Sequence, residues 1–282
     1  MDTKGTLFLV ATPIGNMEDI TFRAVRVLKE VDLIAAEDTR NSIKLLNHYE
    51  ITTPMTSYDE YFKLGKAQFL IDKLNAGDNI ALITDAGTPG ISDPGEELVA
   101  MCYDNNISVT ALPGPAACIT AVTMSGQHCR RFAFEAFLPK DKKERRKLLD
   151  EIKNETRTVV IYEAPHRLKE TLKDLYEAFG DRPITLCREL TKKHEEKERT
   201  TLMGAIDIYN VKEPKGEYVL VIAGKPREEV EAEAKQAWES VSLEEHVNQY
   251  INQGMDKKEA MKAVAKDRGL SKRDVYNALI LQ

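Results

Sequence analysis

The stretch that decides the fold covers residues 80–95 and reads Ile80-Ala81-Leu82-Ile83-Thr84-Asp85-Ala86-Gly87-Thr88-Pro89-Gly90-Ile91-Ser92-Asp93-Pro94-Gly95. It starts as a short apolar run, typical of a strand in a parallel sheet, and continues as a loop rich in glycine and proline. Similar loops follow two other apolar runs, at 11–16 and 112–117. Loops at the carboxyl ends of parallel strands meet along one edge of the sheet, so we expect all three to line one ligand site.

The three loops are not phosphate cradles, because the chain has neither a Gly-x-Gly-x-x-Gly fingerprint nor a Gly-Lys-Ser/Thr motif. Small residues and fixed proline dihedral angles favour backbone groups that approach a flat, polar, largely uncharged ligand, such as a nucleoside. The alternative is that each loop is only a tight strand-to-helix turn.

Outward from these loops, apolar runs alternate with amphipathic helical patterns, which predicts an α/β fold with helices covering a mostly parallel sheet. The first group of expected strands lies at 6–11, 31–36, 80–84 and 109–112, and the second at 132–137, 159–162, 184–187, 200–203 and 218–223. We therefore expect two α/β domains, at 1–125 and 126–226.

The last part of the chain is helical in pattern. An acidic linker helix is expected at 227–239, followed by helices at 243–253, 256–268 and 271–281. The short turn Gly269-Leu270-Ser271 has the length of a helix-turn-helix connection. We expect a small helical module at 240–282.

The net charge of −6 argues against binding of nucleic acid by overall attraction, but it leaves local basic patches open. Two such patches are present: Arg130, Arg131, Lys140, Lys142, Lys143, Arg145, Arg146 and Lys147 form the first, and Lys257, Lys258, Lys262, Lys266, Arg268, Lys272 and Arg273 the second. Each is either an RNA phosphate contact or a solvated helix face.

Neither a signal peptide nor a membrane span is recognisable, so we expect a cytoplasmic protein without membrane contact. The four cysteines lack the spacing of a zinc site or a disulfide framework, and no metal site is expected.

Four motifs stand in the order of one known family: Thr12-Pro13-Ile14-Gly15-Asn16, Ala36-Glu37-Asp38-Thr39-Arg40, Gly87-Thr88-Pro89-Gly90-Ile91-Ser92-Asp93-Pro94-Gly95 and Tyr162-Glu163-Ala164-Pro165-His166-Arg167. On these motifs the chain resembles the bacterial 16S ribosomal RNA (cytidine-2′-O)-methyltransferases, a family of the tetrapyrrole methylase superfamily. The resemblance covers essentially the whole chain.

The resemblance implies a homodimer that holds S-adenosylmethionine in the cleft between its two α/β domains and methylates a cytidine ribose of 16S rRNA in the 30S subunit. Carried over by position, the implied cofactor-binding residues are Pro13, Asp85, Ala86, Gly87, Thr88, Ile91, Ala116, Ala117, Tyr162 and Glu163.

A ribose 2′-hydroxyl is a weak nucleophile, so a carboxylate or another base should help to remove its proton. We expect Glu37 or Asp38 to orient the hydroxyl, with Arg40 as a phosphate or carboxylate partner, because the pair follows an expected strand at its carboxyl end. Glu163, His166 and Glu189 are further candidates. Alternatively, Glu37 and Asp38 cap a helix that starts near Thr39.

Two other functions remain open. A methyltransferase of the same fold could act on a tetrapyrrole precursor, although the basic C-terminal module favours RNA. A ribosome-binding protein without catalysis is the second, although the intact glycine-rich loop argues for a cofactor.

Overall fold

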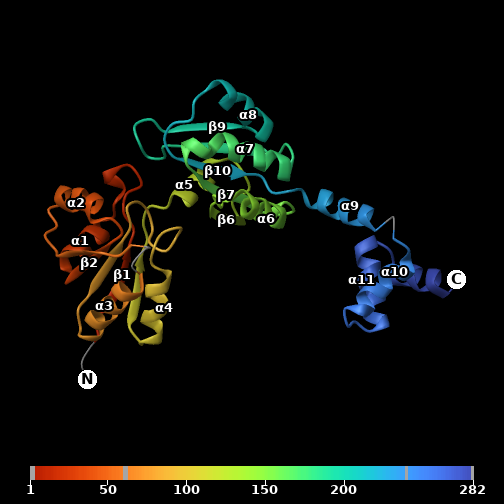
Figure 1. Cartoon of the computed structure of the whole chain (residues 1–282), viewed down its shortest axis with the longest axis horizontal. Coiled ribbons are helices and arrows are strands. Elements are labelled where there is room, and N and C mark those ends of the chain that lie inside the picture. The colour runs from red at the N-terminus through yellow and green to blue at the C-terminus, as the bar shows by residue number, and fades with distance from the viewer. Residues whose placement is uncertain (1–3, 60–62, 239–240, 281–282) are drawn as a thin grey trace. The chain divides into compact units, whose positions relative to one another are not determined.

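The computed structural model describes residues 4–59, 63–238 and 241–280 (Figure 1). These residues form two compact units. The α/β unit consists of Met1–Glu151 with Arg157–Ala223, and the helical unit consists of Ile152–Thr156 with Gly224–Gln282.

The first sheet of the α/β unit is parallel throughout, as expected from the sequence. Its strands are β1 (Thr6–Val10), β2 (Leu33–Ala36), β3 (Met55–Ser57), β4 (Ile80–Ile83) and β5 (Ser108–Leu112), in the order β3-β2-β4-β1-β5. The four strands expected in this region are confirmed. The three-residue strand β3 is additional, because its short sequence Met-Thr-Ser carries no apolar run.

Helices cover both faces of the first sheet. They are α1 (Phe22–Glu30), α2 (Thr39–His48), α3 (Lys63–Asn75) and α4 (Glu96–Asp104), with a 3₁₀ turn at Met17–Asp19. Strand β4 shows why both faces need cover: Ile80 and Leu82 pack against α3 and α4, whereas Ala81 and Ile83 pack against α1 and α2.

The order of the strands brings the three loops together. Strands β4, β1 and β5 are neighbours in the sheet, and each of the three loops follows one of them. The first two loops are also bonded directly, because Thr12 and Gly87 exchange two backbone hydrogen bonds of 2.9 and 3.1 Å. The convergence expected from parallel strands is confirmed.

The second sheet is mixed. Its strands are β6 (Phe132–Phe137), β7 (Thr158–Glu163), β8 (Pro183–Arg188), β9 (Glu196–Thr201) and β10 (Tyr218–Ile222), in the order β6-β7-β10-β8-β9. Only β6 and β7 pair in parallel. Helix α5 (Ala117–Met124) packs on β7 and β10, and α6 (Lys142–Ile152), α7 (Pro165–Phe179) and α8 (Leu202–Val211) complete this part.

The strand expected at 200–203 is wrong in its position. The strand lies at Glu196–Thr201, an exposed edge strand of charged residues that shows no apolar pattern. The Thr201 side chain accepts a hydrogen bond from the Gly204 N–H and starts helix α8, so the apolar residues from Leu202 onward are helical.

The helical unit contains α9 (Arg227–Ala237), α10 (Leu243–Asn252), α11 (Lys257–Arg268) and α12 (Lys272–Ile280). Ser242 and Glu245 form a capping box on α10, and Gly269 ends α11 in the left-handed conformation. A small core joins the last three helices: Val247, Ala260, Met261, Val264, Ala265 and Val275. The helices expected here are confirmed. Within the described part of the chain, no helix has the length and apolar character needed to cross a membrane.

Candidate active site

The α/β unit contains a cavity of about 420 Å³ that both sheets line, which lies within the range of roughly 300–1,000 Å³ of small-ligand sites. The first sheet contributes the loops after β1, β2, β4 and β5, and the second contributes β6, β7, β8, β10 and the segments next to these strands. The residues around it are Ile14, Glu37, Asp85, Ala86, Gly87, Thr88, Ile91, Ser92, Asp93, Ala116, Ala117, Phe137, Tyr162, Glu163, Ala164, Pro165, Cys187, Leu190, Lys192, Glu217, Tyr218 and Val219.

On the first-sheet side, the loop after β4 is held by its own backbone and by its neighbour. Gly87 has a φ of 90°, a conformation that glycine adopts without strain. The Thr88 hydroxyl donates a 2.9 Å hydrogen bond to the Pro115 carbonyl, which ties this loop to the one after β5. The cavity wall formed here is therefore largely preorganised.

On the second-sheet side, Tyr162 is part of the cavity wall. Its ring contacts Phe134 and Phe137 edge-on, and its hydroxyl oxygen accepts a 3.0 Å hydrogen bond from the Cys118 N–H at the start of α5. Burial is the main cause that raises the pKa of Tyr162, so its hydroxyl stays neutral. The two halves also meet where the Asn16 N–H donates a 3.1 Å bond to the Thr191 hydroxyl.

The structure brings ten of the thirteen predicted site residues to this cavity. One of them is the proposed catalytic residue Glu37, and the others are cofactor-binding predictions: Asp85, Ala86, Gly87, Thr88, Ile91, Ala116, Ala117, Tyr162 and Glu163. Pro13 is not among the lining residues, although its neighbour Ile14 is. Asp38, Arg40, His166 and Glu189 do not line the cavity either.

Asp38 and Arg40 are engaged with each other. Asp38 caps α2 and accepts hydrogen bonds from the Arg40 N–H and guanidinium group. These bonds lower the pKa of Asp38 to about 2, and the Arg40 side chain is 89% exposed. Asp38 therefore caps the helix, whereas its neighbour Glu37 lines the cavity.

The sequence reasoning missed several lining residues. Ser92 and Asp93 stand in the quoted loop, and Ala164 and Pro165 in the quoted motif after β7, so both pairs had a local signal. Cys187, Leu190, Lys192, Glu217, Tyr218 and Val219 come from the second sheet and reach the cavity only through tertiary packing. Lys192 bonds to Glu189 at 3.0 Å and to Glu217 at 2.8 Å.

The lining of the cavity combines apolar side chains with carboxyl groups. Five carboxyl groups line it, against the single ammonium group of Lys192. Burial, followed by the charges of Glu37 and Asp85, raises the pKa of Asp93 to about 7. Such a cavity suits a partly apolar ligand that carries positive charge. Among the described residues, no group of three or more His, Cys, Asp or Glu side chains could hold a metal ion.

Comparison with known proteins identifies the family. The profile of the Tetrapyrrole (Corrin/Porphyrin) Methylases matches residues 6–205. A relative from Halalkalibacterium halodurans, named ribosomal RNA small subunit methyltransferase I, is 51% identical over 276 residues, which cover 98% of this chain and 95% of that protein. The relative of the same name from Bacillus subtilis is 49% identical and covers 97% and 94%.

A third relative of that name, from Thermotoga maritima, is 45% identical over 221 residues. These residues cover 99% of that protein but 78% of this chain, so about a fifth of this chain has no counterpart there.

Solved structures agree on the fold of the α/β unit. A uroporphyrin-III C-methyl transferase from Thermus thermophilus, complexed with S-adenyl homocysteine, superposes with a TM-score of 0.56 at 18% identity and covers 78% of this chain and 98% of its own. A cobalt precorrin-4 methyltransferase superposes with a TM-score of 0.57 at 16% identity, covering 77% and 94%. The chain therefore belongs to the tetrapyrrole methylase family and, within it, to the family of ribosomal RNA small subunit methyltransferase I.

Proposed function

We propose that this protein uses S-adenosylmethionine to methylate the ribose 2′-oxygen of a cytidine in 16S rRNA of the 30S subunit. The observation that carries this proposal is the near full-length similarity, at 49–51% identity, to proteins named ribosomal RNA small subunit methyltransferase I.

The cavity suits S-adenosylmethionine in size and charge. Ile14, Ile91, Ala116, Ala117, Leu190 and Val219 offer apolar surface for an adenine ring. Asp85 and Glu37 supply the negative charge that a sulfonium and an ammonium group require. The related fold from Thermus thermophilus holds S-adenyl homocysteine, which differs from the cofactor by the methyl group. We propose the ten lining residues named above as its contacts.

When bound, S-adenosylmethionine supplies a methyl group on a positively charged sulfur, which is an excellent leaving group. The protein has to hold the ribose hydroxyl in line with that methyl group, and such alignment can contribute about 7–11 kcal/mol. A group that accepts the hydroxyl proton contributes further.

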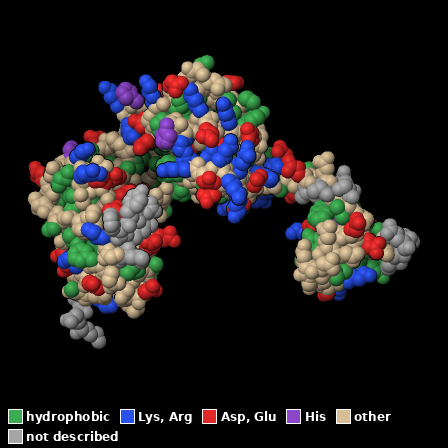
Figure 2. All heavy atoms as spheres, in the orientation of Figure 1, with side chains coloured by type: hydrophobic (Ala, Val, Ile, Leu, Met, Phe, Trp, Pro, Cys, Tyr) green, Lys and Arg blue, Asp and Glu red, His purple; other side chains and the backbone are tan. Residues whose placement is uncertain are grey.

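The basic patch at α6 offers contacts to RNA phosphates. Arg130, Arg131, Lys140, Lys142, Lys143, Arg146 and Lys147 are exposed, and Figure 2 shows Lys and Arg side chains gathered over α6. Neutralised phosphates release counterions, so the contact makes RNA binding weaken steeply with salt.

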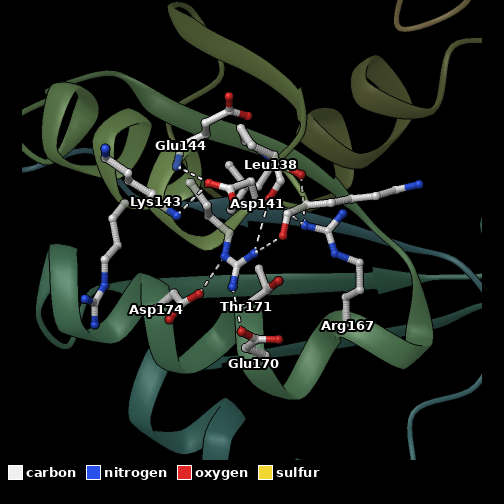
Figure 3. A network of polar contacts seen from close by, with 12 residues as sticks. Leu138, Asp141, Lys143, Glu144, Arg167, Glu170, Thr171 and Asp174 are labelled. Carbon is white, nitrogen blue, oxygen red and sulfur yellow. Dashed lines mark hydrogen bonds and ion pairs between the residues drawn. The ribbon is translucent and has the colours of Figure 1, made fainter.

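Arg145, which the sequence placed in this patch, is not a surface cation but makes internal contacts. It is 3% exposed and bonds to Asp174 and Glu170, both at 2.6 Å (Figure 3). Its guanidinium group also donates to the Pro139 and Lys140 carbonyls, while Arg167 donates to the Leu138 and Pro139 carbonyls. The two arginines therefore fix the segment that leads into α6, and with it the exposed cations.

The helical unit carries a second set of exposed cations: Lys257, Lys258, Lys262, Lys266, Lys272 and Arg273. Arg268 is committed internally, since it donates to His246 and to the Val241 and Ser242 carbonyls. An RNA duplex has no open major groove for a reading helix, so we propose that this unit holds phosphates or folded rRNA.

We further propose, from the family resemblance, that the protein is a cytoplasmic homodimer. Light scattering at micromolar concentration should give twice the monomer mass of 31.8 kDa. A monomer mass contradicts this part of the proposal alone.

The function is tested by incubating 30S subunits that lack their native 2′-O-methylation with labelled S-adenosylmethionine and the protein. We expect label in 16S rRNA and a 2′-O-methylcytidine at one position when the nucleosides are mapped. Tight cofactor binding without incorporation into RNA would leave the family standing and direct the search to small-molecule substrates such as tetrapyrroles.

A further inference from the structure

The five carboxylates of the cavity differ in what holds them. Glu37 accepts a hydrogen bond from the Asp85 N–H at 3.2 Å, and Asp85 accepts one from the Asn41 amide at 2.8 Å. Glu163 accepts bonds from the Ala164 N–H and the Thr171 hydroxyl, and Glu217 accepts one from Lys192. Each of these four is already committed to a donor.

Asp93 is the exception. Within residues 4–59, 63–238 and 241–280, no hydrogen bond or ion pair reaches its carboxylate. It follows Ser92, whose φ of 69° lies in the left-handed region, at the turn of the loop after β4. Among the five carboxylates, that of Asp93 is therefore the one that no donor of the described residues already holds.

The charges around Asp93 favour such a proton. The ionisable groups that line the cavity with it are Glu37 after β2, Asp85 after β4, Tyr162 and Glu163 on β7, Cys187 on β8, Lys192 after β8, Glu217 before β10 and Tyr218 on β10. Burial, Glu37 and Asp85 all favour the neutral carboxyl, and the resulting pKa of Asp93 is about 7. A general base works best when its pKa lies near the working pH.

On the basis of the function proposed above, we propose that Asp93 is the general base that accepts the proton of the ribose 2′-hydroxyl during methyl transfer. The bond that forms joins the 2′-oxygen to the methyl carbon, and the bond that breaks joins this carbon to sulfur, which keeps the electron pair. The hydroxyl proton moves to the Asp93 carboxylate, which becomes neutral as the sulfur loses its positive charge.

The assignment differs from the one expected from sequence. Asp38 lies outside the cavity and is bonded to Arg40, which lowers its pKa to about 2, so it is a weak proton acceptor. Glu37 acts on Asp93 instead: its negative charge opposes the ionisation of the Asp93 carboxyl.

The first experiment follows the carboxyl groups directly, in the protein without cofactor or RNA. With ¹³C-labelled aspartate, we expect one carboxyl resonance that titrates near pH 7 in the wild type and is missing in Asp93→Asn. In Glu37→Gln, which keeps an acceptor for the Asp85 N–H but removes the charge, this resonance should titrate at lower pH. The assignment is overturned if every aspartate titrates near pH 4.

The second experiment measures single-turnover methyl transfer with saturating cofactor and 30S subunits. Asp93→Asn should lower the rate by about 100-fold or more, because a positioned general base contributes about 10²–10⁴-fold. The wild-type rate should fall tenfold per pH unit below the pKa of Asp93 in the complex, which the positive charge of the cofactor lowers from the value of about 7 in the protein alone. This acid limb should disappear in Asp93→Asn and move to lower pH in Glu37→Gln. Asp104→Asn, an exposed change on α4, should leave rate and pH profile as they are.

The outcomes separate the two proposals. If the wild-type protein transfers no methyl group to the subunit, the proposed function fails, whatever Asp93 does. If the wild type is active and Asp93→Asn keeps its rate, only the base assignment fails. A loss that comes entirely from weaker cofactor binding, measured by calorimetry, with an unchanged saturated rate, also overturns the base assignment and makes Asp93 a cofactor ligand.

Discussion

At the scale of single residues, this protein keeps a carboxyl group in a place that costs stability. The ordinary pKa of an aspartate is 3.8, and in the folded chain the pKa of Asp93 is about 7. Between these values the unfolded chain has lost the proton and the folded chain keeps it. The folded state therefore loses stability as the pH rises from about 4 to 7, and the loss stays constant above that range.

Asp93→Asn should therefore stabilise the protein at pH 8 and have little effect at pH 4. We expect a gain on the order of 1–2 kcal/mol at pH 8, discounted for solvent screening because the side chain is partly exposed. Urea unfolding at the two pH values measures it, with Asp104→Asn as the control. An equal effect of Asp93→Asn at both pH values contradicts the raised pKa.

At the scale of elements, the loop after β4 depends on a backbone conformation that few residues adopt. Gly87 has a φ of 90° and exchanges hydrogen bonds with Thr12, so this glycine joins the first two loops of the cavity. Gly65 lies in the first turn of α3, and apart from its chain neighbours and the backbone of its own helix no atom of the described residues lies within 4 Å of an added Cβ. Gly65 therefore serves as the control position for Gly87.

Gly87→Ala should destabilise the protein by about 1–3 kcal/mol and weaken cofactor binding about tenfold, because a residue with a Cβ is strained at this φ. Gly65→Ala should instead stabilise it by up to about 1 kcal/mol, since alanine favours helix. Urea unfolding and calorimetric titration with cofactor check both changes. A Gly87→Ala variant with wild-type stability and affinity would show that the loop tolerates another conformation.

The helical unit contains a buried histidine, His246, whose protonation lowers the stability of the unit. His246 is fully buried, stacks on Trp238 with ring centroids 3.5 Å apart, and accepts a 3.2 Å bond from Arg268. Burial and the Arg268 charge lower the pKa of His246 despite the opposing effect of Asp267. As the pH falls below 6.5, the unfolded chain takes up the proton first, so the helical unit loses stability.

We expect the helical unit to melt at lower temperature at pH 5 than at pH 8. Trp238 is the single tryptophan of the chain, so its fluorescence reports on this unit. The variant His246→Phe keeps an aromatic ring in the stack and removes the titrating group. Its melting temperature should therefore lose the part of the pH dependence that His246 contributes. A wild-type midpoint that is the same at pH 5 and pH 8 rules this account out.

At the scale of the whole molecule, the cavity and the helical unit are separable. All residues that line the cavity belong to the α/β unit, and 78% of this chain covers 99% of the Thermotoga maritima relative. The six exposed cations of the helical unit lie outside the family profile at 6–205.

A chain that ends at Pro226 should bind cofactor as the full chain does, but bind 30S subunits more weakly and with a shallower salt dependence. Filter binding over a range of KCl concentrations measures both. Replacing Lys257 and Lys258 by alanine in the full-length chain should change the salt slope in the same direction without removing a core. Equal affinity of the shortened and full chains at every salt concentration would assign the helical unit another role.

The sequence by itself determined the features that depend on neighbouring residues. Apolar runs such as 80–83 specify buried strands, glycine and proline specify the loops, and residues such as Ser242 and Gly269 mark helix ends. These signals predicted the α/β fold, the helical module and ten of the residues that line the cavity, because the loops follow adjacent parallel strands.

Only the tertiary structure decided which ionisable groups face the cavity and in what state. Lys192 and Glu217 meet across two segments, Asn16 meets Thr191 across 175 positions, and Arg145 is buried by Asp174 of another helix. The choice between Asp38 and Asp93 as the general base also depends on the tertiary structure. Asp38 is bonded to its neighbour Arg40, whereas the proton affinity of Asp93 depends on burial and on the charges of Glu37 and Asp85, which folding brings close.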